Sequence, residues 1–116
     1  LTEAGNQPMI DKNTGNAITY NGEVYNFKRL RDHCEEKGDF FETRTDTEVI
    51  LKLYNHYGID CLKYLRGMFA FAIWNSKKQR LFFARDRLGV KPLIYTLNNK
   101  RLFIASEIYA LTKHPE

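Results

Sequence analysis

The segment Asn21-Gly22-Glu23 places a side-chain amide next to a glycine, and this pair of residue types suits acyl-transfer chemistry. The Asn21 side chain offers a neutral amide donor, and the Gly22 N–H can approach a ligand closely because no Cβ intervenes. Two such donors aimed at one point make an oxyanion hole. The Asn-Gly pair is also a common β-hairpin turn, and taken by itself it favours that structural interpretation.

A carboxylate at the start of an expected helix, Asp46, is the second candidate. It could bind the ammonium group of an amino-acid ligand. The same carboxylate would also interact favourably with the helix dipole, by about 0.3–1 kcal/mol. Considered without the other residues, Asp46 is better explained by this structural role. Arg85 and Asp86, at the end of a later strand, could pair and brace the turn that follows. We expect a structural role there too, because nothing marks either residue as a nucleophile or a general base.

Apolar periodicity predicts the elements that position these residues. Asn26 and Asp60 are expected to cap helices, and Thr45 with Glu48 has the form of a capping box. The apolar run of residues 68–74 is typical of a strand covered on both faces. Short turns between successive strands predict an α+β fold with an antiparallel sheet. The expected strands are 17–20, 40–43, 68–74, 81–85, 93–96 and 101–105, the last four as one meander, and the expected helices are 26–38, 45–58, 60–65 and 106–111.

Composition excludes several classes of function. With 116 residues the chain is one domain in size, and its net charge of +4 is dispersed among acids rather than gathered in a nucleic-acid patch. Arg66-Gly67 precedes an aromatic strand, but the aromatic residues are out of phase with the RNA-recognition signature. No apolar run is long enough to cross a membrane. Cys34 and Cys61 match no zinc-ligand spacing and indicate reduced thiols in a cytoplasmic protein.

Several blocks of the sequence together resemble one family, the class II glutamine amidotransferase domain of asparagine synthetase. The blocks cover almost the whole chain and occur in the same order. They are NGEVYN at 21–26, TDTEVIL at 45–51, LRGMFAFAIW at 65–74, ARDRLGVKPL at 84–93 and ASEI at 105–108.

The resemblance implies the N-terminal-nucleophile hydrolase fold, an αββα sandwich of antiparallel sheets. It also implies an oxyanion hole from the Asn21 side chain and the Gly22 N–H. Glu23 and Asp46 resemble the groups that hold the α-amino end of glutamine. In that family an N-terminal cysteine attacks the glutamine amide through a thioester.

The chain departs from the family pattern because Cys34 and Cys61 both fall inside expected helices. Neither can offer the free α-amine that serves as the base. Residues 1–116 are therefore expected to be a partial domain, incomplete at the N-terminus. The nucleophile strand would precede Leu1, and the synthetase domain with ATP and Mg would follow Glu116 of the same polypeptide. We expect no cofactor or metal in these residues, no activity from them alone, and oligomers through uncovered sheet edges.

The expected parent activity is that of a carbon–nitrogen ligase. The domain would release ammonia from glutamine for the ATP-dependent amidation of aspartate to asparagine. One alternative is a related amidotransferase that amidates another carboxylate in antibiotic or surface-polysaccharide biosynthesis. A second alternative is a non-catalytic remnant that only binds or scaffolds.

Overall fold

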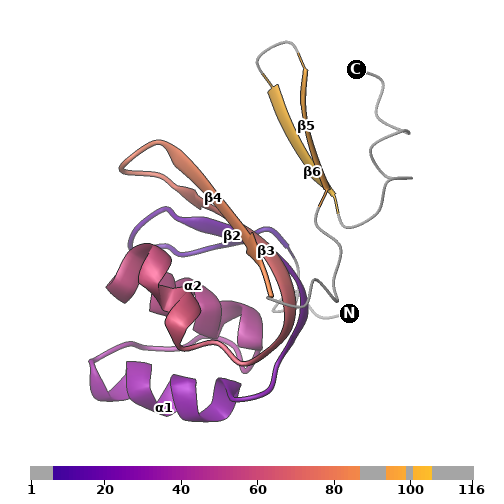
Figure 1. The fold of residues 1–116 in the computed structure, drawn as a ribbon. Helices are drawn as coiled ribbons and strands as arrows, with labels where there is room; N and C mark the ends of the chain where they lie inside the picture. Colours follow the sequence, from indigo (N-terminus) through magenta and orange to yellow (C-terminus); the bar gives the residue numbers. More distant parts are fainter. Residues whose placement is uncertain (1–6, 87–93, 99–100, 106–116) are drawn as a thin grey trace.

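An antiparallel sheet with helices packed on one face makes up most of the fold (Figure 1). The computed structural model describes residues 7–86, 94–98 and 101–105. None of the helices within these residues is long and apolar enough to span a membrane. The elements are β1 (Met9–Ile10), β2 (Ala17–Val24), α1 (Phe27–Glu36), α2 (Asp46–Tyr57), a 3-10 helix (Gly58–Lys63), β3 (Gly67–Asn75), β4 (Arg80–Arg85), β5 (Ile94–Asn98) and β6 (Arg101–Ala105).

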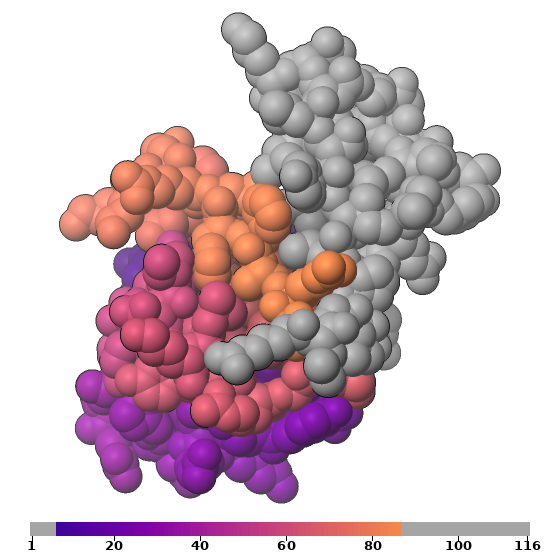
Figure 2. All heavy atoms as spheres, viewed as in Figure 1, coloured from indigo at the N-terminus to yellow at the C-terminus, as the bar shows by residue number. Residues whose placement is uncertain are grey.

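The main sheet has the strand order β1-β2-β3-β4, with every pair antiparallel. Strand β2 pairs with β3 along its whole length, from Ala17 opposite Trp74 to Val24 opposite Gly67. Both helices lie on the same side of this sheet: α2 packs against β2, and α1 packs against α2 (Figure 1). In the space-filling view α1, α2 and β4 form one continuous surface (Figure 2).

Apolar side chains on the helix-facing side of the sheet form the core. From β2 it receives Ile18 and Val24, and from β3 it receives Phe69, Phe71 and Ile73. Residues 69–73 of β3 are all buried, whereas Met68 is half-buried and Trp74 is exposed, so the prediction of a strand covered on both faces is confirmed for the middle of the run. The α+β class predicted from the sequence is confirmed.

The predicted helices agree well with α1 and α2, but several strand predictions are wrong. The predicted turn at Asn21-Gly22 lies inside β2, because β3 continues to pair with these residues. No strand forms at 40–43. The predicted four-strand meander is divided: β3 and β4 belong to the main sheet, whereas β5 and β6 pair separately. The predicted helix at 106–111 lies outside the described residues.

Two predicted helix caps also differ from the structure. Asn26 precedes α1 but makes no side-chain cap. Its amide nitrogen donates to the Tyr64 carbonyl at 2.8 Å, and its Oδ1 accepts from the Arg66 N–H at 3.1 Å, so it ties α1 to the segment before β3. Asp60 does not cap a helix, because the 3-10 helix already begins at Gly58.

The capping box at α2 is half correct. Thr45 Oγ1 accepts the Glu48 N–H at 3.3 Å, as predicted. The Glu48 carboxylate, however, accepts from the N–H groups of Glu42 and Thr43, at 3.0 and 2.7 Å, and from the Thr43 hydroxyl at 2.7 Å. The loop before α2 therefore takes these hydrogen bonds, and the expected strand at 40–43 is replaced by a turn folded over Glu48.

We expect Glu48→Ala to lower the free energy of unfolding by about 1.5–3 kcal/mol, because buried hydrogen bonds to a charged group would be lost. The control is Glu35→Ala, which removes a half-exposed i,i+4 ion pair with Arg31 and should cost about 0.3–0.5 kcal/mol. Urea unfolding of the two variants measures the difference. Equal losses would contradict the role assigned to Glu48.

Candidate functional site

The candidate site lies along the edge of β2 that faces away from β3. Tyr25 N–H donates toward the β3 side, to the Arg66 carbonyl. The Tyr20 N–H instead donates to Gln7 Oε1 at 2.6 Å, and the Val24 N–H to Asp46 Oδ2 at 3.2 Å. Alternation along an antiparallel strand places the Gly22 N–H on this same outer edge, between the other two.

Two glycines let β2 and β3 approach closely beside this edge. Gly22 lies opposite Phe69, and Gly67 lies opposite Val24. Their φ angles are 144° and 147°, which L side chains rarely adopt. A Cβ on Gly22 would overlap the carbonyl oxygen of Met68 and lie 2.7 Å from Phe69 Cα. The position of the Gly22 N–H is therefore set by backbone packing.

Asp46 joins this edge from the helix side, as the first residue of α2. Its Oδ2 accepts from the Tyr20 hydroxyl at 2.6 Å as well as from the Val24 N–H. Burial raises the pKa of Tyr20, and the bond to Asp46 raises it further, so the phenol remains a neutral donor. A carboxylate thus lies at the edge that carries the Gly22 N–H.

Asn21 and Glu23 lie on the opposite face of β2 from Tyr20, since successive strand residues alternate. Both side chains are exposed. Asn21 pairs across the sheet with Ala70, and Glu23 pairs with Met68. The four predicted site residues therefore occur in one region of the sheet, with Asn21 and Glu23 on the face without helices and Asp46 at the strand edge.

Neither cysteine is placed to act as a nucleophile. Cys34 and Cys61 are free thiols and fully buried. Burial raises the pKa of each to about 12, with Asp39 adding to the effect at Cys34 and Asp60 at Cys61. A thiol with such a pKa supplies almost no thiolate at neutral pH.

Asp86 has a structural position, and the turn that Arg85 and Asp86 were expected to brace lies outside the described residues. Its carboxylate accepts the Phe69 N–H at 3.0 Å, and its own N–H donates to the Phe69 carbonyl at 3.0 Å. These bonds hold the start of β3, opposite Gly22, to the end of β4.

Sequence reasoning missed two other residues at the site, Tyr20 and Gln7, because nothing in the sequence marks their partners.

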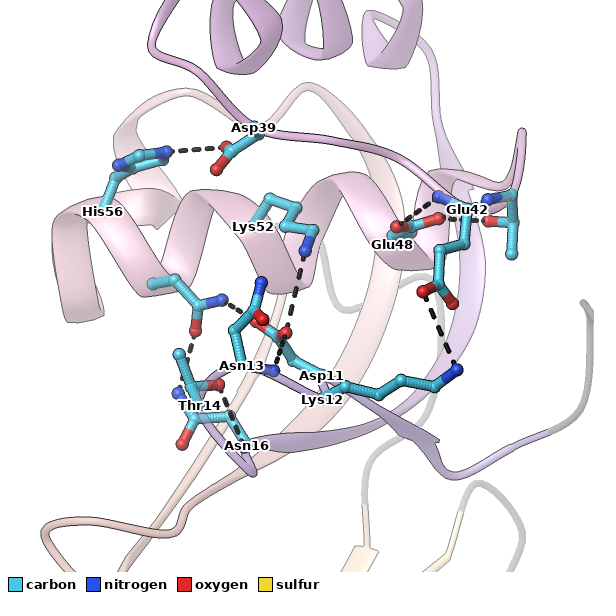
Figure 3. Close-up of polar contacts among 12 residues, drawn as sticks. Asp11, Lys12, Asn13, Thr14, Asn16, Asp39, Glu42, Glu48, Lys52 and His56 are labelled. Carbon is cyan, nitrogen blue, oxygen red and sulfur yellow. Dashed lines mark hydrogen bonds and ion pairs between the residues drawn. The ribbon is translucent and has the colours of Figure 1, made fainter.

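A polar cluster away from the candidate site stabilises β1 against α2 (Figure 3). The buried Asp11 lies 3.7 Å from the Lys52 ammonium and accepts from the Asn55 amide. Burial alone would raise the pKa of Asp11, but the Asn13 N–H and the Lys52 charge outweigh it and leave the pKa below its usual value. A cleft of about 420 Å³ beside this cluster is lined by residues 8–13, by the loop before α2 and by α2 itself, and by none of the four predicted site residues. Within the described residues, no group of three or more His, Cys, Asp or Glu could hold a metal ion.

The fold is that of an N-terminal-nucleophile amidotransferase. The structure superimposes on the glutamine phosphoribosylpyrophosphate amidotransferase from B. subtilis with a TM-score of 0.77 and 28% sequence identity, over 91% of this chain and 25% of that one. A structure described as the allosteric regulatory enzyme of purine biosynthesis gives a TM-score of 0.74 at 27% identity, with the same coverage.

The whole chain, residues 1–116, matches the family model described as a glutamine amidotransferase domain, and the chain belongs to that family. It is 46% identical over 116 residues to asparagine synthetase [glutamine-hydrolyzing] 3 of Bacillus subtilis, covering 98% of this chain and 19% of that protein. It is 39% identical over 108 residues to amidase chry2 of Gibberella zeae, covering 93% and 16%. The chain thus spans between about a sixth and a fifth of the length of these curated relatives.

Proposed function

We propose that this chain is the glutamine-binding part of a glutaminase domain, and that its parent protein uses the released ammonia to amidate aspartate to asparagine. The edge of β2 is the observation that carries the proposal. It holds a backbone donor at Gly22 and a carboxylate at Asp46, next to an exposed amide at Asn21 and a second carboxylate at Glu23. Neutral donors suit a developing oxyanion, and carboxylates suit an ammonium group.

In this proposal Asp46 and Glu23 hold the α-ammonium of glutamine, which directs the side-chain amide along β2. A thiolate from outside these 116 residues attacks the amide carbon. The carbonyl oxygen becomes an oxyanion, stabilised by the Gly22 N–H and the Asn21 side-chain amide. The carbon–nitrogen bond then breaks, the nitrogen takes up a proton, and ammonia leaves. Water hydrolyses the thioester to glutamate and restores the thiol.

The acceptor of the ammonia would be bound outside this chain, in a synthetase domain of the same polypeptide. ATP and Mg²⁺ would be bound there as well. The B. subtilis relative supports asparagine as the product. The second candidate is a related amidotransferase with another acceptor, because the chain is also similar to a protein that is named an amidase and not an asparagine synthetase. The two free thiols fit a reducing cytoplasm.

The proposal is tested with the full-length protein that contains this chain. We expect it to release ammonia from glutamine, and we expect Asp46→Asn to raise KM for glutamine by about 10–100-fold, because a charged partner of the ammonium is lost. Amidation driven by free ammonia should be unchanged, because it does not require glutamine. An Asp46→Asn variant with the wild-type KM would contradict the assigned ammonium site.

We also expect the 116-residue chain alone to release no ammonia from glutamine above the buffer blank. Both of its thiols are buried, with pKa values raised to about 12. A coupled ammonia assay on the purified chain, with and without a thiol-alkylating reagent, is the measurement. Turnover that the reagent abolishes would place the nucleophile within these residues.

A further inference from the structure

Asp46 is fixed to the sheet through one of its two carboxylate oxygens. Oδ2 accepts both the Tyr20 hydroxyl, at 2.6 Å, and the Val24 N–H, at 3.2 Å. No donor within the described part of the chain contacts Oδ1. The Thr45 cap fixes the backbone at the start of α2, so the remaining freedom of Asp46 lies in its side-chain torsions. Two donors on one oxygen remove that freedom and leave the other oxygen for a ligand.

The two donors are not equivalent. The Val24 N–H belongs to the backbone and is present whatever side chain occupies the position. The Tyr20 hydroxyl comes from a side chain packed against the core, and its raised pKa keeps it protonated. Its 2.6 Å bond is also the shorter of the two, as expected for a hydroxyl that donates to a carboxylate. Tyr20 is therefore the side chain that sets the orientation of Asp46.

We propose that Tyr20 is a positioning residue for substrate recognition: its hydroxyl holds Asp46 so that Oδ1 faces the α-ammonium of glutamine. The inference rests on the proposed function and extends it to a residue that does not itself touch the substrate. The Tyr20–Asp46 pair would then favour ligands that, like glutamine, carry a primary ammonium group on the carbon next to their own carboxylate, over ligands that lack this ammonium group.

Tyr20→Phe in the full-length protein tests this role, because it removes only the hydroxyl and keeps the ring in the core. We expect KM for glutamine to rise about tenfold while kcat changes less than about threefold, since a hydrogen bond to a charged group in the binding site is lost. The control is Tyr54→Phe. Tyr54 lies farther along α2, and its hydroxyl accepts a hydrogen bond from the Asn75 amide on β3. This variant should leave KM unchanged, and its melting temperature shows what loss of a tyrosine hydroxyl costs in stability.

Two further measurements separate positioning from a general structural role. Inhibition by 4-carbamoylbutanoate, which is glutamine without its α-amino group, should be equally strong in wild type and Tyr20→Phe. In an Asp46→Asn background, Tyr20→Phe should raise KM no further. An unchanged KM in the single variant, or an equal loss of affinity for 4-carbamoylbutanoate, would overturn the inference.

The outcomes also separate this inference from the proposed function. If wild type releases ammonia and Asp46→Asn binds glutamine weakly while Tyr20→Phe behaves as wild type, only the role of Tyr20 fails. If wild type releases no ammonia from glutamine, or Asp46→Asn binds glutamine normally, the assigned function or its ammonium site fails first, and the inference about Tyr20 fails with it.

Discussion

Replacement of Asn21 by Ala should lower the rate of glutamine hydrolysis by the full-length protein about 10²–10³-fold. The Asn21 amide would donate to the oxyanion that forms in the transition state, and such donors contribute little to ground-state binding. KM for glutamine should therefore change much less than kcat. Amidation supplied with free ammonia should continue at the wild-type rate, because that reaction does not pass through the oxyanion.

The measurement compares glutamine-dependent and ammonia-dependent product formation, with a melting curve for each variant. The control is Asn13→Ala, which removes an exposed amide from the turn after β1 and retains the backbone N–H that donates to Asp11. Wild-type glutamine turnover in Asn21→Ala would exclude Asn21 from the oxyanion hole. A parallel loss of both activities and of stability would make it a structural residue of β2.

Gly22→Ala should be the most destabilising substitution at the site, by about 2–6 kcal/mol. Its φ of 144° is strained for alanine, at about 1–3 kcal/mol. The new Cβ would also overlap the Met68 carbonyl, and overpacking of this kind adds about 1–3 kcal/mol. Because small domains have only about 5–15 kcal/mol of stability in total, much of it would be lost.

Urea unfolding followed by the fluorescence of Trp74, the single tryptophan, measures this effect on the 116-residue chain. Gly38→Ala is the matched control: its φ is 100°, but among the described residues no heavy atom outside its chain neighbours lies within 4 Å of the added Cβ. It should show the cost of backbone strain without the clash. If the two alanine variants are equally stable, the close approach of β2 and β3 at Gly22 does not constrain the fold.

Periodicity located the helices and the buried strand well because these depend on which side chains face the core. Leu30 and Cys34 on α1 recur at helical spacing, and both are buried. The apolar run of β3 likewise predicted a strand covered on both faces. Such patterns extend over many residues, so local exceptions do not obscure them.

The errors occurred where a local signal competed with a distant partner. Asn-Gly predicts a turn locally, but its pairing with Ala70 and Phe69 keeps it in a strand. Glu48 has the spacing of a capping box, yet the loop N–H groups of residues 42 and 43 take its carboxylate.

For the site itself, the sequence drew attention to Asp46 but gave no sign of Tyr20, because the two residues are 26 positions apart. The assigned roles of Asn21, Gly22, Glu23 and Asp46 remain predictions. The structure adds their positions on the sheet.

The hydrogen bonds at the outer edge of β2 also affect whether another strand can pair with this edge and block the site. Bare strand edges tend to attract further strands, because their N–H and C=O groups are unpaired. Here the side chains of Gln7 and Asp46 already occupy the N–H groups of Tyr20 and Val24, on either side of Gly22. An incoming strand would have to displace both side chains before it could pair in this stretch. The same two contacts thus protect the edge against pairing with a foreign strand. Between them they leave the single N–H of Gly22 for the carbonyl group of a small ligand.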